Sequence, residues 1–82
     1  MVLVDVFVPS VDKTYNFSLN ESVTIESVIL EITEMIEQKE RTTLLGEKTD
    51  LNLYKVKEAS ILPRKNSLAE CYVTSGTRLI LA

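Results

Sequence analysis

The spacing of the apolar residues changes near residue 20, and this change constrains the fold more than any other feature of the sequence. From residue 2 to residue 19 many apolar side chains recur at every second position, which is typical of half-buried β-strands. From residue 25 they recur at steps of three and four, which places them on one face of an α-helix. The sequence therefore predicts two strands followed by a helix. The predicted helical stripe consists of Ile25, Val28, Ile29, Ile32, Met35 and Ile36.

The two strands are predicted to pair as a β-hairpin. Residues 1–8 and 14–19 alternate, and the residues between them, Pro9 to Lys13, are typical of a turn. Asp5 sets the phase of the first strand, because a carboxylate belongs on the solvent side. The side chains then expected to face the core are Val4, Val6, Tyr15, Phe17 and Leu19, and those expected on the opposite face of the first strand are Leu3 and Phe7.

Several signals define the predicted helix over residues 24–40. Thr24 suits the N-cap, and Glu26 lies in the first turn, where the helix dipole favours an acid. Val23 and Val28 have the spacing of a hydrophobic staple. We therefore expect a helix that packs one apolar face against the strands.

The second half of the chain carries weaker signals. Residues 41–50 are predicted to form a loop, although Leu44 and Leu45 before Gly46 would also suit a helix that continues to a glycine C-cap. Residues 51–58 are predicted to form a strand whose alternation slips, which we attribute to a bulge near Leu53. Ser67 and Glu70 have the spacing of a capping box and predict one short helical turn. A turn at residues 75–76 and a final strand over residues 77–82 complete the prediction.

Composition excludes several functional classes. The 82 residues predict one domain, residues 1–82, and they contain no histidine and one cysteine. A disulfide framework, a Cys/His zinc site and a histidine-dependent catalytic triad are therefore excluded, and we expect no cofactor and no metal site. No apolar run is long enough to insert into a membrane, and no signal peptide is recognisable, so we expect a cytoplasmic protein.

The net charge of −3 argues against nucleic acid as a partner. The charge is unevenly distributed, with −5 over residues 1–41 and +2 over residues 42–82. The predicted helix accounts for much of the acidic half. Glu31, Glu34 and Glu37 have the spacing of its solvent face rather than of a metal site.

The order strand, strand, helix, strand, short helix, strand resembles the β-grasp arrangement of ubiquitin. Individual segments also resemble that family: Thr24-Ile25-Glu26 at the helix start, residues 68–73, and residues 75–81 near the end. The resemblance implies an α+β fold with a mixed sheet and one main helix packed on one face. The segment 67–82 is most similar to the YukD-like proteins, which accompany bacterial type VII (ESX-like) secretion systems. That similarity implies a cytosolic, non-catalytic accessory protein.

Ubiquitin and related carriers need a C-terminal diglycine for conjugation or sulfur transfer. This chain ends in Leu79-Ile80-Leu81-Ala82, and its two glycines are Gly46 and Gly76. We therefore expect a non-conjugating module. Because the sequence also has no histidine and no phosphate-binding loop, we expect that it is not an enzyme. Two alternatives remain: a ubiquitin-like domain of a larger scaffold protein, and a carrier-type protein whose diglycine tail is absent here.

An exposed apolar cluster is the predicted interaction site. A sheet covered by one helix leaves its other face open, and apolar residues there favour a protein contact. The expected members are Leu3, Phe7, Tyr54 and Ile80, with a basic rim of Lys55, Lys57, Arg64, Lys65 and Arg78. The expected partner is an acidic protein surface, such as a secretion-system membrane or ATPase component, and weak homo-oligomerisation is an alternative use of the same face.

Two other residues are interpreted as ordinary features of a folded domain. Leu30 is expected to be a single exposed apolar residue on the helix. Cys71 is expected to be a buried or half-buried structural residue, because the adjacent Glu70 raises the pKa of a thiol and no base is nearby in the sequence.

Overall fold

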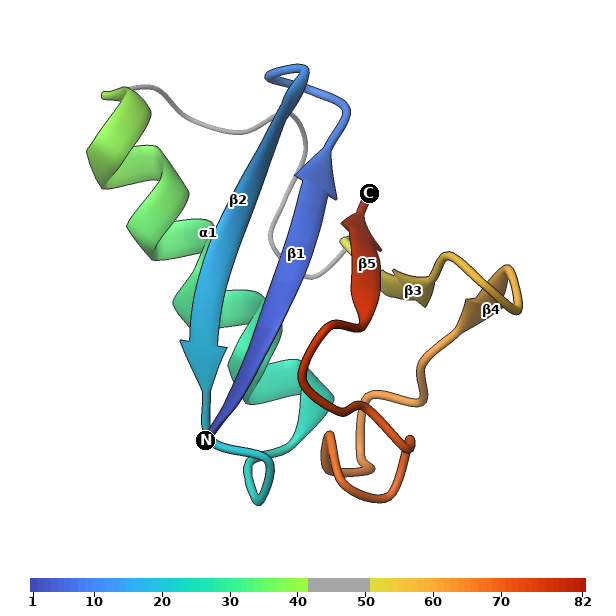
Figure 1. Cartoon of the computed structure of the whole chain (residues 1–82). Helices are drawn as coiled ribbons and strands as arrows, with labels where there is room; N and C mark the ends of the chain where they lie inside the picture. Colours follow the sequence, from blue (N-terminus) through green and yellow to red (C-terminus); the bar gives the residue numbers. More distant parts are fainter. Residues whose placement is uncertain (42–50) are drawn as a thin grey trace.

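A five-stranded mixed sheet carries one α-helix across one of its faces (Figure 1). The computed structural model describes residues 1–41 and 51–82. The strand order is β2-β1-β5-β3-β4, where β1 (Val2–Val8) lies between β2 (Lys13–Leu19), to which it is antiparallel, and β5 (Arg78–Leu81), to which it is parallel. This arrangement confirms the predicted α+β, ubiquitin-like β-grasp fold.

The core forms between the inward-facing side chains of the strands and the apolar face of the helix. On β1, Val4 and Val6 are buried while Leu3 is exposed, so the predicted phase of this strand is confirmed. The apolar face of α1 (Ile25–Glu40) packs on the same side of the sheet. Burying a side chain of this size contributes about 1.5–3 kcal/mol, so this shared core is the main source of stability. The fully buried side chains of α1 and β5 include Ile25, Ile29, Ile32, Ile36, Leu79 and Leu81.

Both ends of α1 are capped. At the N-terminus the side chain of Thr24 accepts a hydrogen bond from the Ser27 amide at 3.3 Å, as predicted. The amides of Ile25 and Glu26 donate to the carbonyls of Asn66 and Arg64, so the loop before the last strand satisfies two further helix amides. At the C-terminus Arg41 adopts a left-handed conformation with φ 52°. The predicted helix over residues 24–40 is thereby confirmed.

The buried stripe of the helix differs from the prediction at Met35. Met35 is 38% exposed, whereas Thr33 is fully buried and its hydroxyl donates to the Ile29 carbonyl at 2.6 Å. The two residues flank the stripe on opposite sides, since each lies about 80° from the direction of Ile25 at 100° per residue. Met35 lies on the flank next to β2, the edge strand of the sheet, where a groove remains open. The prediction that Met35 belongs to the core was therefore wrong.

The predicted strand over residues 51–58 is also corrected. β3 covers Leu53–Lys55 only, and a turn at residues 56–59 leads into β4 (Ser60–Ile61), which pairs back on β3. The register of β3 with β5 is continuous, so no bulge lies near Leu53. The slip in alternation instead marks the turn, where Ala59 has φ 52° and its amide donates to the Val56 carbonyl.

The capping box at residues 67–70 forms as predicted. The Ser67 amide donates to the Glu70 carboxylate at 2.8 Å, and the Glu70 amide donates to the Ser67 hydroxyl at 3.1 Å. The Cys71 amide donates to the Ser67 carbonyl, which closes one turn, and Tyr72 then adopts φ 59°. The left-handed residue ends the helical path, so this segment is a single turn, as predicted.

The last part of the chain matches the prediction, with Gly76 at φ 92° in the turn before β5. The loop predicted for residues 41–50 lies, apart from Arg41, outside the described residues. Within residues 1–41 and 51–82, no helix has the length and apolar character needed to cross a membrane.

Candidate protein-interaction site

A row of apolar side chains crosses four strands on the sheet face away from α1. Phe7 of β1 lies opposite Ile80 of β5, Ile80 lies opposite Tyr54 of β3, and Tyr54 lies opposite Ile61 of β4. Residues paired directly across a sheet share a face, so these four side chains point the same way. We refer to Phe7, Ile80, Tyr54 and Ile61 as the apolar row.

The apolar row contains three residues that the sequence predicted and one that it did not. Phe7, Ile80 and Tyr54 are partly exposed, and Ile61 is 56% exposed. Ile61 was missed because the sequence did not reveal the two-residue strand β4. Its signal was present in the pattern Ser60-Ile61-Leu62, where Leu62 is buried and Ile61 consequently faces outward.

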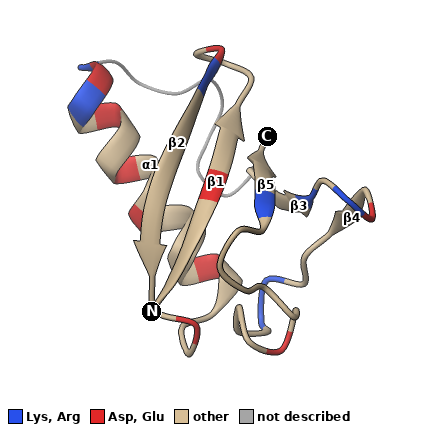
Figure 2. Cartoon of the chain, in the orientation of Figure 1, with Lys and Arg blue, Asp and Glu red and all other residues tan. Residues whose placement is uncertain are grey.

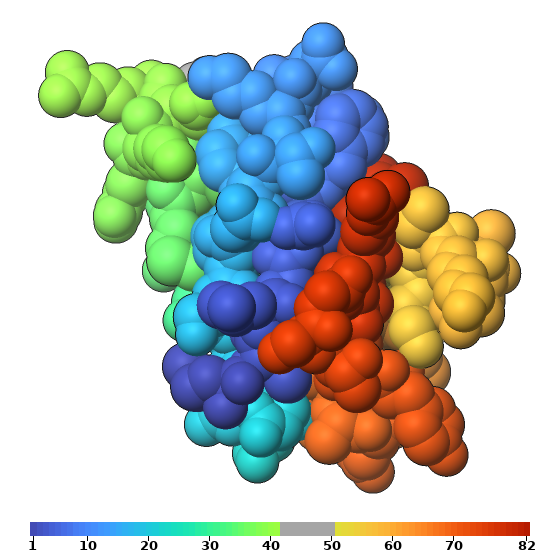
Figure 3. Space-filling model, viewed as in Figure 1, coloured from blue at the N-terminus to red at the C-terminus, as the bar shows by residue number. Residues whose placement is uncertain are grey.

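A shallow open groove of about 470 Å³ accompanies one end of the row. Phe7 and Ile80 line it together with Val56, Asp5 and Arg78, among others. Figure 3 views this open face, on which β1 and β2 in blue, β5 in red and the segment containing β3 and β4 in yellow form a continuous surface. The apolar row therefore lies on the open face of β1, β5, β3 and β4.

Leu3 lies on the same face but outside the row. Asp5 stands between Leu3 and Phe7 on β1, and the Asp5 carboxylate accepts a hydrogen bond from the Asn16 side chain. The Leu3 amide donates to the Ser75 hydroxyl at 3.2 Å, and the Gly76 amide donates to the Leu3 carbonyl at 2.8 Å. Leu3, although 62% exposed, is thus placed beside the turn before β5 rather than beside Ile80.

The predicted basic rim separates into groups that do not act together. Lys55 lies opposite buried Leu79 and therefore points to the helix side of the sheet. Its Nζ donates to the Cys71 carbonyl at 3.2 Å and lies 3.6 Å from the Glu58 carboxylate, with the side chain only 16% exposed. The charge of Lys55 is consequently used within the fold.

Arg64 and Lys65 lie away from the apolar row. The Arg64 guanidinium donates to the Leu51 carbonyl, and the Arg64 carbonyl accepts from the Glu26 amide at the start of α1. Lys65 follows in the same loop. Of the five predicted basic residues, Lys57 and Arg78 remain exposed near the open face, and Figure 2 shows the contrast between this region and the acidic residues spaced along α1.

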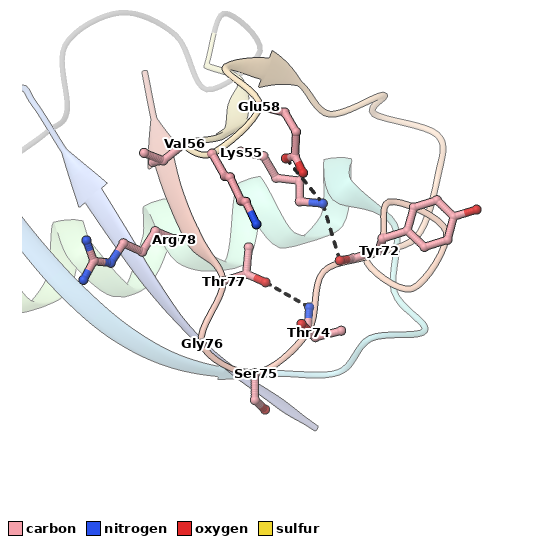
Figure 4. A pocket seen from close by; sticks show the side chains of 10 residues that line it. Lys55, Val56, Glu58, Tyr72, Thr74, Ser75, Gly76, Thr77 and Arg78 are labelled. Atoms are coloured by element: carbon pink, nitrogen blue, oxygen red, sulfur yellow. Dashed lines mark hydrogen bonds and ion pairs between the residues drawn. The ribbon is translucent and has the colours of Figure 1, made fainter.

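Lys57 and Arg78 line a second open groove of about 560 Å³ (Figure 4). The turn of residues 74–77 forms one wall, and Tyr72 stands at the end away from Arg78, with its ring projecting outward. Val56 and Arg78 line both grooves, so the two are contiguous. The site is therefore an apolar row that continues into a polar, positively charged groove.

Cys71 is buried, as predicted, and is not placed for nucleophilic chemistry. Burial raises the pKa of its thiol, the Glu70 carboxylate raises it further, and Lys55 opposes this effect. The thiol is therefore protonated near neutral pH, which makes it a weak nucleophile. In the described part of the chain, His, Cys, Asp and Glu form no group of three that could hold a metal ion.

Comparisons with solved structures show the fold. The chain superposes on the EccD5 ubiquitin-like domain from Mycobacterium xenopi with a TM-score of 0.78 and 21% identity, covering 99% of this chain and 91% of that one. Caldiarchaeum subterraneum ubiquitin gives a TM-score of 0.74 at 11% identity, covering 98% and 89% of the two chains. The ubiquitin-like domain of an Arabidopsis thaliana protein gives 0.73 at 18% identity, covering 99% and 74%. No family model and no curated protein sequence matches the chain.

Proposed function

We propose that this protein is a non-catalytic, non-conjugating interaction module that docks its open sheet face on a partner protein. The observation that carries the proposal is the apolar row. Four aligned, partly exposed apolar side chains on a sheet face are a common basis for protein contacts, whereas scattered exposed apolar residues are ordinary. The charged pair Asp5 and Arg78 lies beside the row, two residues before Phe7 and Ile80, and a combination of apolar and charged residues is typical of protein interfaces.

The last residues of the sequence pair with the segment before β3. The Asn52 amide donates to the Ala82 carbonyl at 2.7 Å, and the Ala82 amide donates to the Asn52 carbonyl at 3.0 Å. Leu79 and Leu81 lie in the core. The non-conjugating part of the proposal rests on the sequence, because its two glycines, Gly46 and Gly76, are not adjacent and the 82 residues contain no diglycine.

We place the module with a bacterial type VII (ESX-like) secretion system, as a cytoplasmic accessory. Two observations support this role: the similarity of residues 67–82 to the YukD-like proteins, and the fold shared with the EccD5 ubiquitin-like domain. The partner is then a membrane or ATPase component of that system. The second candidate is a ubiquitin-like domain within a larger scaffold protein. It is supported by the match of 99% of this chain to a structure that is itself a ubiquitin-like domain of another protein.

Site-specific crosslinking tests the docking proposal. A photo-reactive phenylalanine analogue replaces Tyr54 in the tagged protein expressed in its source cells, and crosslinked partners are identified by mass spectrometry. We expect a secretion-system membrane or ATPase component to be captured, and capture to be lost when Phe7→Asp is added. Leu30→Asp, which adds the same charge at an exposed apolar residue of α1, is the matched control and should retain capture.

Three outcomes contradict the proposal. Equal capture with and without Phe7→Asp would show that the row is not the docking surface. A bait of increased mass from a covalent adduct at Ala82 would support a carrier instead. Recovery of the sequence only within a longer natural polypeptide would support the scaffold alternative.

A further inference from the structure

Tyr72 combines a strained backbone with an exposed ring. Its φ is 59°, in the left-handed region, and the residue is 82% exposed. A residue with a Cβ in this region costs about 1–2 kcal/mol relative to the right-handed conformation. A bulky aromatic residue is unusual there, and glycine or asparagine is the common choice.

The fold requires the left-handed backbone at position 72 but not the tyrosine side chain. The Tyr72 amide donates to the Ala69 carbonyl at 3.0 Å, and the Val73 amide donates to the Leu68 carbonyl at 3.0 Å. These bonds close the turn whatever the side chain. Because the ring is mostly in solvent, burial does not offset the strain. Strain of this kind at an exposed residue points to a functional use.

The groove next to Tyr72 has unused positive charge. Lys57 and Arg78 are both exposed, and within residues 1–41 and 51–82 neither forms an ion pair. By contrast, Lys55 is neutralised by Glu58 and held by the Cys71 carbonyl. The two free cations therefore line one groove, and Tyr72 lies at its end with the ring projecting outward (Figure 4).

We propose that this groove binds an extended acidic segment of the partner protein, with carboxylates at Arg78 and Lys57 and an apolar or aromatic contact at Tyr72. The inference rests on the proposed function and specifies the partner's chemistry. Because Val56 and Arg78 line both grooves, a segment that leaves the apolar row enters the charged groove directly. The acidic residues along α1 repel an acidic segment from the helix, so the charge distribution also directs the segment to the groove.

The occupant is a protein segment rather than a nucleic acid. Two free cations neutralise few phosphates, and the whole chain has a net charge of −3. A protein segment supplies both the carboxylates for the groove and the apolar side chains for the neighbouring row. This combination matches the polar rim and apolar centre of protein interfaces.

A peptide titration tests the charged groove by itself. The probe is a synthetic peptide of four glutamates followed by leucine and phenylalanine, added to ¹⁵N-labelled protein at about 50 mM salt. We expect saturable amide shifts at Lys57, Tyr72 and residues 74–78. Lys57→Glu should weaken binding at least about tenfold, a loss of about 1.4 kcal/mol. Lys65→Glu carries the same charge change in another loop and should stay within about twofold.

Two further variants separate the contributions. Arg78→Gln removes a cation without placing a second carboxylate beside Asp5, its register partner, and should weaken the peptide about fivefold. Tyr72→Asn introduces a side chain that tolerates φ 59°. This variant should bind the peptide about threefold more weakly, while the folded protein becomes more stable. Binding unchanged by Lys57→Glu, or shifts confined to other residues, overturns the inference.

Crosslinking from Tyr54 distinguishes this inference from the proposed function. Loss of partner capture with both Phe7→Asp and Lys57→Glu supports both. If Phe7→Asp abolishes partner capture and Lys57→Glu does not, the acidic-segment inference is wrong and the proposed docking function is still supported. Capture that survives both substitutions overturns both.

Discussion

Phe7 of β1 lies directly opposite Ile80 of β5 in a parallel pair, so residues from the two ends of the chain stand side by side on the open face. The same pairing places Val6 opposite Leu79 on the buried face. One register therefore builds the core and the candidate interaction surface together. The two sets are separable by mutation, because adjacent residues of a strand point to opposite faces.

The first prediction concerns Phe7→Asp. Phe7 is partly exposed and faces away from α1, so we expect the fold to persist with a loss of about 1 kcal/mol, or about 4–8 °C in Tm for a domain of this size. Partner capture should be abolished. Thermal unfolding followed by circular dichroism checks the fold. If the variant is unfolded at 25 °C, Phe7 belongs to the core and our assignment of the open face is wrong.

Relief of backbone strain gives the second prediction. Tyr72→Gly should raise stability by about 1 kcal/mol, because glycine adopts a positive φ without a steric cost. Thr74→Gly is the control at a neighbouring exposed residue without a positive φ, and it should not stabilise. Urea unfolding of the three proteins measures the difference. A Tyr72→Gly variant less stable than wild type would show that the ring contributes to folding.

A third prediction tests the role assigned to Lys55. Lys55→Met keeps the aliphatic stem and removes the hydrogen bond from Nζ to the Cys71 carbonyl. We expect a loss of about 1–2 kcal/mol, since the donor is charged and mostly shielded from water. Amide hydrogen exchange should quicken at Cys71 and Val73. Lys57→Met, an exposed neighbour, should change stability by less than about 0.5 kcal/mol.

The fourth prediction is a pH dependence of stability at Glu40. A hydrogen bond from Lys13 lowers the pKa of this carboxyl, so the ion pair stabilises the folded state above the usual carboxyl range near 4.5. That contribution is lost as the pH falls through the lowered folded pKa. Wild type should exceed Glu40→Gln in Tm at pH 7, and the difference should shrink as the pH falls below the usual carboxyl range. A constant difference across this range would contradict the linkage.

Paired truncations on α1 test the corrected helix phase. Ile36→Ala removes a fully buried side chain and should cost about 2–5 kcal/mol, a large part of the stability of a small domain. Met35→Ala removes a side chain that is 38% exposed and should cost about 1 kcal/mol or less. Denaturant unfolding measures both. Equal losses of unfolding free energy in the two variants would show that Met35 belongs to the core.

Local signals in the sequence were sufficient for the hairpin and the helix. The alternation on β1 and β2 depends on adjacent residues, and the Thr24 cap and the Ser67–Glu70 capping box are contacts between residues three apart. Such contacts form wherever the segment folds, because they do not depend on distant partners. The prediction became less accurate over residues 51–61, where β3 has three residues and β4 has two.

Short elements of this kind are stabilised by their neighbours rather than by their own pattern. β3 exists because β5 and β4 pair on either side of it. The sequence placed Lys55 in a basic rim because an isolated lysine near an apolar residue is usually solvated. Its partners, the Cys71 carbonyl and Glu58, became known only when the strand and the following turn were in place.

The sequence by itself determined the fold class, the face of β1 that is buried, the helix and its N-terminal cap, and the open-face residues Phe7, Tyr54 and Ile80. Only the tertiary structure decided that these three align with Ile61, that Leu3 stands apart, and that Lys57 and Arg78 share a groove with Tyr72. The physical reason is range. Periodicity and capping act within a few residues, whereas strand order and register depend on the free energy of burying one common core.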